Sequence, residues 1–398
     1  MSRALARPMG EAIPWVQSPE NTLESLRHAI MMFDGIEFDV RITADRQLIV
    51  HHDREVSIPK DQLGQPTAWV EEWKHDDLVD LGFLSFSDLL ADRTVQRLWA
   101  EEGKMGCIEI KRPHPKASSG GGFFGRSQHN QHVADAMKLA EKALDEHGIP
   151  QKNTVFYAFH KGMPASASLA KTQRPWAALI PYIPPYGTRN TQRLQALPQY
   201  ISMPFKRLVN RHRAQGSSML PCAVEYFQSS TRRLPLGRPV GLHGAGFKRL
   251  NRSRNGMPTY VWPTRPDIEH ALLHAGMTAL TDHADPEMTW LPSGHLRWNR
   301  PGTRPLTKDQ WACLSVSEDD HLSVLKDLEK DTPTWSECDQ PRRRALVQHW
   351  KERWNWRPSV ESILSEFSEA TPPWSAPRII GHRGSGKTAR PVLNPQSM

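Results

Sequence analysis

The stretch GIEFDVRITADRQLIVHHD, from Gly35 to Asp53, decides how the rest of the chain is interpreted. Side chains alternate between the two faces of an extended strand, so Glu37 and Asp39 point the same way while their apolar neighbours point the other way. Two carboxylates on an apolar strand are costly to bury unless a metal ion, a cationic partner or a shared proton compensates their charge. A divalent cation with oxygen ligands is the simplest explanation, and a surface hairpin with solvated acids is the alternative.

Two further motifs place reactive side chains at predicted strand ends. A return strand, Gln47–Val50, leads into the sequence HHD, which brings imidazole groups near the end of that strand. Another short apolar strand, Cys107–Ile110, contains Glu109, and Lys111 lies two residues on and therefore on the same face. An acid and a base that point together can bind a metal and a phosphate side by side, and an ordinary salt bridge is the alternative.

Four motifs together resemble the glycerophosphodiester phosphodiesterase family, in that family's order. They are PENTLES (Pro19–Ser25), IEFDV (Ile36–Val40), VHHD (Val50–Asp53) and IEIK (Ile108–Lys111). The family's opening motif, a strand that ends in His-Arg-Gly, does not precede PENT, but RIIGHRGSGKT occurs at Arg378–Thr388. We therefore expect the family's order in circularly permuted form, with both ends of the chain on the catalytic face.

The resemblance implies metal-assisted hydrolysis of a glycerophosphodiester to glycerol 3-phosphate and an alcohol. By this resemblance Glu37, Asp39 and Glu109 hold Mg²⁺ or Ca²⁺ through hard oxygen ligands. His382 and His52 are the two histidines that deprotonate the attacking group and protonate the leaving alkoxide.

The resemblance also implies contacts to the substrate. Arg383 and Lys111 are expected to neutralise phosphate oxygens, and Trp262 to stack on the alcohol portion unless it only packs the rim. The family pattern puts the catalytic histidine immediately before the aspartate, so His51 is interpreted as structural, and so is Asp282. Further candidates for the edge of the site are Glu20, Asn21 and Lys387.

Strands that alternate with helices indicate parallel β/α units, and eight such units predict a (β/α)₈ TIM-type barrel with catalytic groups at the C-terminal strand ends. The sixth strand is either Tyr200–Met203 or Ala223–Phe227. The other predicted strands, besides the Gly35 strand, are Cys107–Ile110, Thr154–Phe159, Trp176–Ile183, Pro258–Trp262, Met277–Asp282 and, first in the barrel order, Arg378–His382. At the end of the fourth strand Ala158, Phe159 and His160 stand where family members often carry a Ser-Phe pair.

Three parts of the chain follow from this count. We expect strands 2 to 8 of the barrel in residues 1–289, a small Trp-rich helical insert in 290–376, and the first strand with its loop in 377–398. Helical spacing occurs in the insert at Asp319–Glu329, Pro341–Trp354 and Val360–Phe367, and the last of these is expected to be the eighth barrel helix.

Several expectations concern helices and loops outside the insert. A helix begins near Asn21, which has capping-box spacing to Glu24, and another runs from Gln131 to Glu146. The Gly- and Ser-rich segment Lys116–Gln128 is interpreted as a mobile loop beside the site, either a lid or a disordered insertion.

Composition limits the class of protein. The chain has 398 residues, a mean hydropathy of −0.59 and no long apolar run, which argues against a membrane span. The N-terminus lacks a signal-peptide apolar region and the four cysteines show no C-x-x-C spacing, so we expect a cytoplasmic protein without a zinc or disulfide framework.

Charge is concentrated in one part of the chain. The net charge is +8, and Lys206–Arg254 contains eleven Lys or Arg against one acid, Glu225. This segment could contact phosphate, nucleic acid or an anionic membrane surface, or it could be a solvated loop. We expect a small phosphodiester as the substrate, disfavour nucleic acid as a partner, and retain contact with a membrane surface as an option.

Three alternative functions remain. A related lyase-like chemistry would let a substrate hydroxyl attack and give a cyclic phosphate. The segment Gly381–Thr388 matches the phosphate-binding loop of P-loop NTPases, but Pro391 and Pro395 follow where that loop must open a helix, which disfavours nucleotide binding. A non-catalytic binding protein on the same fold is the third alternative.

Overall fold

A computed structural model describes residues 17–56, 69–122, 125–183, 186–228, 240–284, 309, 335, 337–354, 358–368 and 373–388. Its central sheet has eight parallel strands, in the order β6-β5-β4-β1-β10-β9-β8-β7. Their bounds are β1 Gly35–Ile42, β4 Met105–Ile110, β5 Thr154–Ala158, β6 Trp176–Ala178, β7 Leu220–Ala223, β8 Thr259–Thr264, β9 Thr278–Thr281 and β10 Ile379–Gly381.

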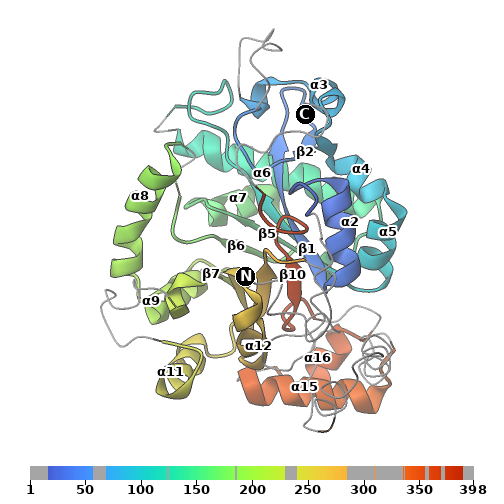
Figure 1. Ribbon diagram of the computed structural model, residues 1–398, viewed down its shortest axis with the longest axis vertical. Helices are drawn as coiled ribbons and strands as arrows, with labels where there is room; N and C mark the ends of the chain where they lie inside the picture. The colour runs from blue at the N-terminus through green and yellow to red at the C-terminus, as the bar shows by residue number, and fades with distance from the viewer. Residues whose placement is uncertain are drawn as a thin grey trace, which may run out of the picture.

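The two ends of this strand order also meet. The Ser218 N–H, just before β7, donates to the carbonyl oxygen of Trp176 in β6 at 3.0 Å. The sheet therefore closes almost completely, and helices surround it (Figure 1). The predicted (β/α)₈ barrel is confirmed.

The last strand in the sequence lies in the middle of the sheet. β10 pairs with β1 through Gly381 and Ile36, and with β9 along its whole length (Figure 1). Counted from β10, the strands follow one another around the barrel in chain order. The expected position of the C-terminal strand is confirmed, while a circular permutation of the family's order stays a prediction.

The sixth barrel strand is β7, so both candidates for it were wrong. Tyr200–Met203 falls at the end of helix α8, and Ala223–Phe227 shares only its first residue with β7 before the chain enters α10 (Glu225–Gln228). Pro221 made this strand hard to recognise, because proline lacks the N–H that sheet pairing uses. Here the Leu220 N–H donates to the carbonyl oxygen of Pro258, just before β8. The nitrogen of Pro221 therefore points the other way, toward the weakly paired seam with β6.

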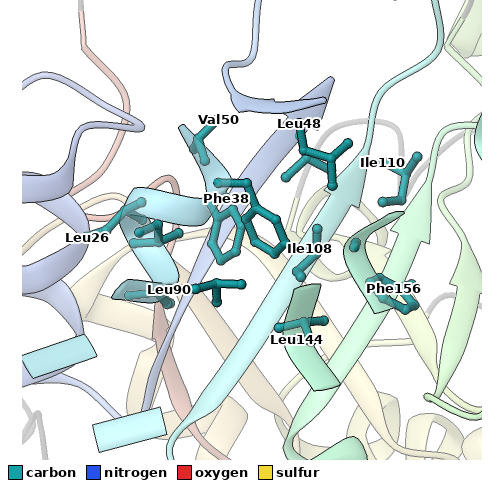
Figure 2. Close-up of a cluster of buried hydrophobic side chains, with 14 of the residues drawn as sticks. Leu26, Phe38, Leu48, Val50, Leu90, Ile108, Ile110, Leu144 and Phe156 are labelled. Carbon is teal, nitrogen blue, oxygen red and sulfur yellow. The ribbon is translucent and has the colours of Figure 1, made fainter. Parts of the chain in front are cut away.

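Alternation along β1 divides its side chains between two layers. Ile36, Phe38 and Val40 belong to the apolar layer between the sheet and the helices, and the acids between them face the barrel interior. Figure 2 shows that layer, with labelled residues from α2, β1, β2 (Leu48–Val50), α4, β4, α6 and β5: Leu26, Phe38, Leu48, Val50, Leu90, Ile108, Ile110, Leu144 and Phe156.

The helices that follow the strands cover the outside of the barrel. They are α2 Leu23–Met32, α4 Phe86–Ala91, α5 Arg93–Gln96, α6 Arg126–Glu146, α7 Met163–Ala170, α8 Arg189–Ser202, α9 Phe205–Ala214, α11 Gly244–Arg254 and α12 Pro266–His274. Helix α3, His75–Asp80, packs against β2 instead. Short elements complete the set: η2 Val70–Glu72, β3 Leu84–Ser85, η3 Arg97–Glu101 and η4 Gln151–Asn153. None of the described helices combines the length and apolar character needed to cross a bilayer.

Two details of the helices differ from the predictions. The N-cap of α2 is Thr22, whose side chain accepts from the Ser25 N–H, so the capping box predicted from Asn21 was wrong. α6 begins at Arg126, earlier than predicted and inside the Gly-rich segment. In that segment Gly120 and Gly122 donate to the carbonyl oxygens of Ala117 and Pro115, which folds its described part into turns, and the role of a lid stays untested.

Helices α15 (Gln340–Trp354) and α16 (Val360–Glu366) pack on each other below the strands, at the end where the strands begin (Figure 1). The Lys152 ammonium lies 5.2 Å from the centre of the Phe367 ring, which joins this helical pair to the start of β5. The predicted helix Asp319–Glu329 lies outside the described residues. The three-part division of the chain and the use of α16 as eighth barrel helix stay predictions.

Candidate active site

Three acids from two neighbouring strands meet inside the carboxyl end of the barrel. Asp39 of β1 is in register with Glu109 of β4, and Glu37 lies two residues before Asp39 on the same face. Each acid is buried and offers one oxygen, and these oxygens lie within 4.8 Å of one another. The predicted alternation therefore brings together the three residues proposed as metal ligands.

The three carboxylates repel one another in this buried position. Burial, followed by the charges of Asp39 and Glu109, raises the pKa of Glu37 well above its ordinary value. Burial also raises the pKa of Glu109. For Asp39 burial acts in the same direction, but Lys111 and Arg383 outweigh it and hold that pKa well below its usual range.

Lys111 sits between two of these acids. Its ammonium nitrogen lies 2.7 Å from Asp39 Oδ1 and hydrogen-bonds to Glu109. It is itself largely buried at the end of β4, so it supplies positive charge where water cannot reach freely. A phosphate placed beside the acids would find this cation within the same group of side chains.

Asn21 holds Asp39 from the other side. Its Nδ2 donates to Asp39 Oδ2 at 2.9 Å, and its Oδ1 accepts from the Asp39 N–H at 3.2 Å. This residue has a φ of 61°, a left-handed conformation that asparagine tolerates better than most residues. The suggestion that Asn21 borders the site agrees with this geometry.

The segment after β10 completes the site from the C-terminal end of the chain. The Arg383 N–H donates to Glu37 Oε2 at 2.8 Å, and its guanidinium pairs with Glu20 at 2.8 Å. Its Nε lies 3.7 Å from Asp39 Oδ2. Gly384 follows with a φ of 80°, and a Cβ on it would lie 2.4 Å from Ser25 Oγ, so only glycine fits.

His382 faces the acids and is oriented by Asp282, which the sequence predicts to be structural. Its Nδ1 lies 2.7 Å from Asp282 Oδ1, and its Nε2 lies 3.7 Å from Glu37 Oε2. Burial lowers the pKa of His382 although Asp282 opposes that shift. A carboxylate on Nδ1 sets the tautomer that presents an Nε2 lone pair to the site.

Asp282 therefore belongs to the site by position. Burial would raise its pKa, but His382 outweighs this and holds the pKa of Asp282 well below its usual range. The signal that could have identified it is its place directly after β9, since the C-terminal ends of barrel strands carry catalytic groups.

The adjacent histidines of the HHD sequence have different surroundings. His52 is half-buried, lies 2.8 Å through Nδ1 from Asp53 Oδ1, and lines the cavity at this end of the barrel. His51 is buried and packs edge-on against Phe83, with ring centres 4.7 Å apart. This placement agrees with the choice of His52 over His51 as the candidate for proton transfer.

A cavity of about 880 Å³ opens over these residues. One wall is aromatic and apolar, where Trp262 meets Phe159 edge-on at 6.0 Å between ring centres. Of the three residues that depart from the family's Ser-Phe pair, Phe159 thus lines the cavity, whereas His160 turns away to Asn130 Oδ1. Arg54 and Arg112 line the cavity as well.

The residues Gly381–Thr388 do not form a phosphate-binding loop of the NTPase kind. Such a loop needs free backbone N–H groups that point at a phosphate. Here those of Arg383, Lys387 and Thr388 donate to the carboxylates of Glu37, Asp282 and Glu20. Up to Thr388, the last described residue, no residue of this segment is helical. This geometry disfavours the nucleotide-binding alternative further.

A comparison with known protein families independently supports the predicted family resemblance. Residues 9–105 match the model of the glycerophosphoryl diester phosphodiesterase family. The resemblance to that family is confirmed. So is the prediction of a phosphodiesterase-type enzyme, at the level of this family. The matched residues include Glu37, Asp39 and His52 but end before Glu109. No curated protein matches the chain.

Solved structures with some likeness carry related descriptions. A glycerophosphoryl diester phosphodiesterase, described as putative, from Silicibacter pomeroyi is 14% identical, with a TM-score of 0.44 and coverage of 69% of this chain and 88% of its own. A phosphodiesterase from Oleispira antarctica in complex with the product sn-glycerol-3-phosphate is 13% identical, with a TM-score of 0.39 and coverage of 64% and 82%. Glycerophosphodiester phosphodiesterase from Thermotoga maritima is 16% identical, with a TM-score of 0.36 and coverage of 63% and 83%. Identities and TM-scores this low establish neither fold nor activity.

Proposed function

We propose that the protein is a metal-dependent phosphodiesterase that cleaves glycerophosphodiesters to glycerol 3-phosphate and an alcohol. The observation that carries the proposal is the meeting of three buried acids with His382 and two cations, Lys111 and Arg383, at the carboxyl end of the barrel. The family match over residues 9–105 supports the same reaction class.

The donor set suits a hard divalent cation. Glu37, Asp39 and Glu109 offer only carboxylate oxygens, which Mg²⁺ and Ca²⁺ prefer. Burial is the main cause of the raised pKa values of Glu37 and Glu109, and the neighbouring carboxylates add to it, so a bound divalent cation would offset the cost of holding these charges away from water. When bound there, a divalent ion would supply Lewis-acid polarisation of a phosphoryl oxygen.

The chain's own residues then account for binding and proton transfer. Arg383 and Lys111 bind non-bridging phosphate oxygens and stabilise the charge that grows on them in the transition state. His382, held by Asp282 with Nε2 toward the acids, takes the proton of the attacking water or hydroxyl. His52, at the cavity wall, returns a proton to the leaving alkoxide.

The aromatic wall supports a role in holding the alcohol portion. Trp262 and Phe159 present ring surface to the cavity, which fits the non-reacting part of a phosphodiester. If a hydroxyl of the substrate itself attacks, the same residues give a cyclic phosphate, so the lyase reaction is the second candidate. Phosphorus NMR of the product separates the two reactions.

The test is release of glycerol 3-phosphate from glycerophosphocholine or glycerophosphoethanolamine in the presence of Mg²⁺ or Ca²⁺. We expect Glu37→Gln to lower metal affinity in calorimetry, and His52→Ala to keep the metal but lose turnover. His51→Ala is the matched control and should keep turnover. Undiminished activity in excess chelator would overturn the metal assignment, and a damaging His51→Ala change would overturn the choice of His52.

A further inference from the structure

One half of the barrel is almost free of acidic residues. Residues 147–266, which contain β5 to β8 and the helices between them, hold eighteen Lys or Arg and one acid, Glu225. Since the whole chain carries a net charge of +8, the remainder is net acidic. Helices α8, α9 and α11 of this half lie together along one side of the barrel (Figure 1).

Exposed bases occur on each of these three helices. Arg193 lies on α8, Lys206 and Arg207 on α9, and Lys248 and Arg252 on α11, all with exposed side chains. The surface formed by these three helices is called the basic face below. This part of the sequence holds a single carboxylate, so the basic face carries an excess of positive charge that attracts anions.

Not every base of the predicted segment Lys206–Arg254 contributes to this face. Arg254 is buried and donates to the carbonyl oxygens of Gly276 and Ala275, at 2.9 and 2.6 Å. It closes off the end of α12 and serves the fold. The binding surface is therefore defined by the exposed sides of three helices, one of which, α8, lies before that segment.

Helix α8 also exposes apolar side chains. Leu194 is 69% exposed and Leu197 is 36% exposed, and residues three apart share one face of a helix. On the other side of α8, Ala196 is buried and Gln192 lines the active-site cavity. A helix with exposed leucines and flanking bases, and with no acid of its own, has the character of an interfacial helix.

The position of α8 ties this surface to the cavity. Ile183, just before the helix, and Gln192, on its first turn, line the cavity. Gln199 further along accepts from the Tyr182 N–H at 2.8 Å, which fixes the helix to the loop that follows β6. Whatever binds the exposed side of α8 therefore comes to lie beside the entrance to the site.

We propose that the basic face docks on an anionic membrane surface, with Leu194 and Leu197 inserted at the boundary of headgroups and acyl chains. The bases meet lipid phosphates while the leucines leave water, so both features of the face are used. A nucleic acid would use the bases but leave the leucines exposed. As a consequence that rests on the proposed function, the site takes phosphodiesters of membrane-bound lysolipids as well as soluble ones.

The test is cosedimentation of the full chain with vesicles of phosphatidylcholine alone and with vesicles containing about one third phosphatidylglycerol. We expect binding only to the anionic vesicles, weakened by salt. Leu194→Gln together with Leu197→Gln should lower the partition coefficient roughly tenfold or more. Met31→Gln, at a 60% exposed position on α2, is the matched control and should leave binding unchanged.

A second arm separates charge from the leucines. Lys206→Gln with Lys248→Gln should reduce binding to anionic vesicles, whereas Lys142→Gln on α6 should not. Equal binding of the leucine variant and the parent protein, or salt-sensitive binding to duplex DNA without vesicle binding, would overturn the proposal. Hydrolysis of soluble glycerophosphocholine should be the same in the leucine variant, so loss of the proposed function would show separately from loss of docking.

Discussion

Removing the C-terminal strand should unfold the barrel and not merely inactivate it. Deletion of the residues after Ala376 takes away β10, which lies between β1 and β9. The resulting gap leaves the facing edges of both strands without partners. Because such edges are buried here, their backbone groups would lose hydrogen bonds that water cannot readily replace.

The size of the effect follows from the contacts of the segment. Besides the ladder bonds of β10 itself, four backbone hydrogen bonds join residues 378–384 to β1, to β9 and to Asp34, and each contributes about 1 kcal/mol. Ile379 and Ile380 are fully buried, and each side chain contributes about 1.5 to 3 kcal/mol. The total of roughly 7 to 10 kcal/mol is comparable to the whole stability of a typical domain.

Urea unfolding, followed by tryptophan fluorescence and circular dichroism, measures this effect. Ile380→Ala alone should cost about 2 to 5 kcal/mol, and Met31→Ala at an exposed position should stay within about 0.5 kcal/mol. Full-length His382→Ala should be folded and inactive, which separates loss of the site from loss of the fold. A truncated protein that unfolds cooperatively with unchanged stability would refute the reasoning and the assignment of His382.

Moving the strand to the other end of the chain provides the complementary experiment. Gln17 Nε2 lies 3.3 Å from the carbonyl oxygen of Lys387, so the two described ends meet on the face of the barrel that carries the site. A chain that starts at residue 377, continues through 398 into residue 1 and ends at Ala376 should fold and keep its activity. A permuted chain that fails to fold would show that the connection through residues 285–376 is needed for more than linking the strands.

Three further predictions concern single residues. Asp282→Asn should lower kcat about tenfold or more and shift the pH profile of kcat, because the carboxylate orients His382. Metal affinity in calorimetry should stay the same, since the carboxylate only orients that histidine. An unchanged pH profile would contradict this role. Burial lowers the pKa of His212 to about 3 in the folded protein. As the pH falls below about 6.5, this histidine therefore takes up a proton in the unfolded state first, and its contribution should lower the free energy of unfolding by about 2 kcal/mol at pH 5. The drop between pH 7 and pH 5 should be smaller in His212→Asn, and an equal drop in both proteins would refute the assignment. Gly384→Ala should cost more stability than Gly148→Ala, by thermal unfolding, because both have a positive φ but only Gly384 also meets neighbours within 3 Å; equal costs would show that the contact with Ser25 relaxes freely.

Local pattern was sufficient to predict much of this protein. The period-two alternation in the Gly35 strand predicted which side chains enter the barrel interior, and the structure places Glu37 and Asp39 there. The succession of strand and helix patterns predicted the barrel, because each β/α unit is encoded by residues close in sequence. The His-Arg-Gly motif predicted that the C-terminal segment joins the first part of the chain, and β10 pairs with β1.

Other features depended on contacts between distant residues. Asn21 had the spacing of a helix cap, but Asp39 is close enough in the folded chain to take its side chain, so Thr22 caps α2. The strand containing Pro221 is tolerated because the proline nitrogen, which has no N–H, faces β6, and the seam between β6 and β7 is weakly paired.

The site itself was decided mostly in three dimensions. Asp282 and His382 are 100 residues apart, and only the pairing of β9 with β10 places one beside the other. The basic face likewise exists because three helices from two β/α units, α8 and α9 after β6 and α11 after β7, come to lie on one side of the barrel. Residue type and spacing specify what a strand or helix presents along its own length, whereas the packing of strands around the barrel determines which side chains from different units meet.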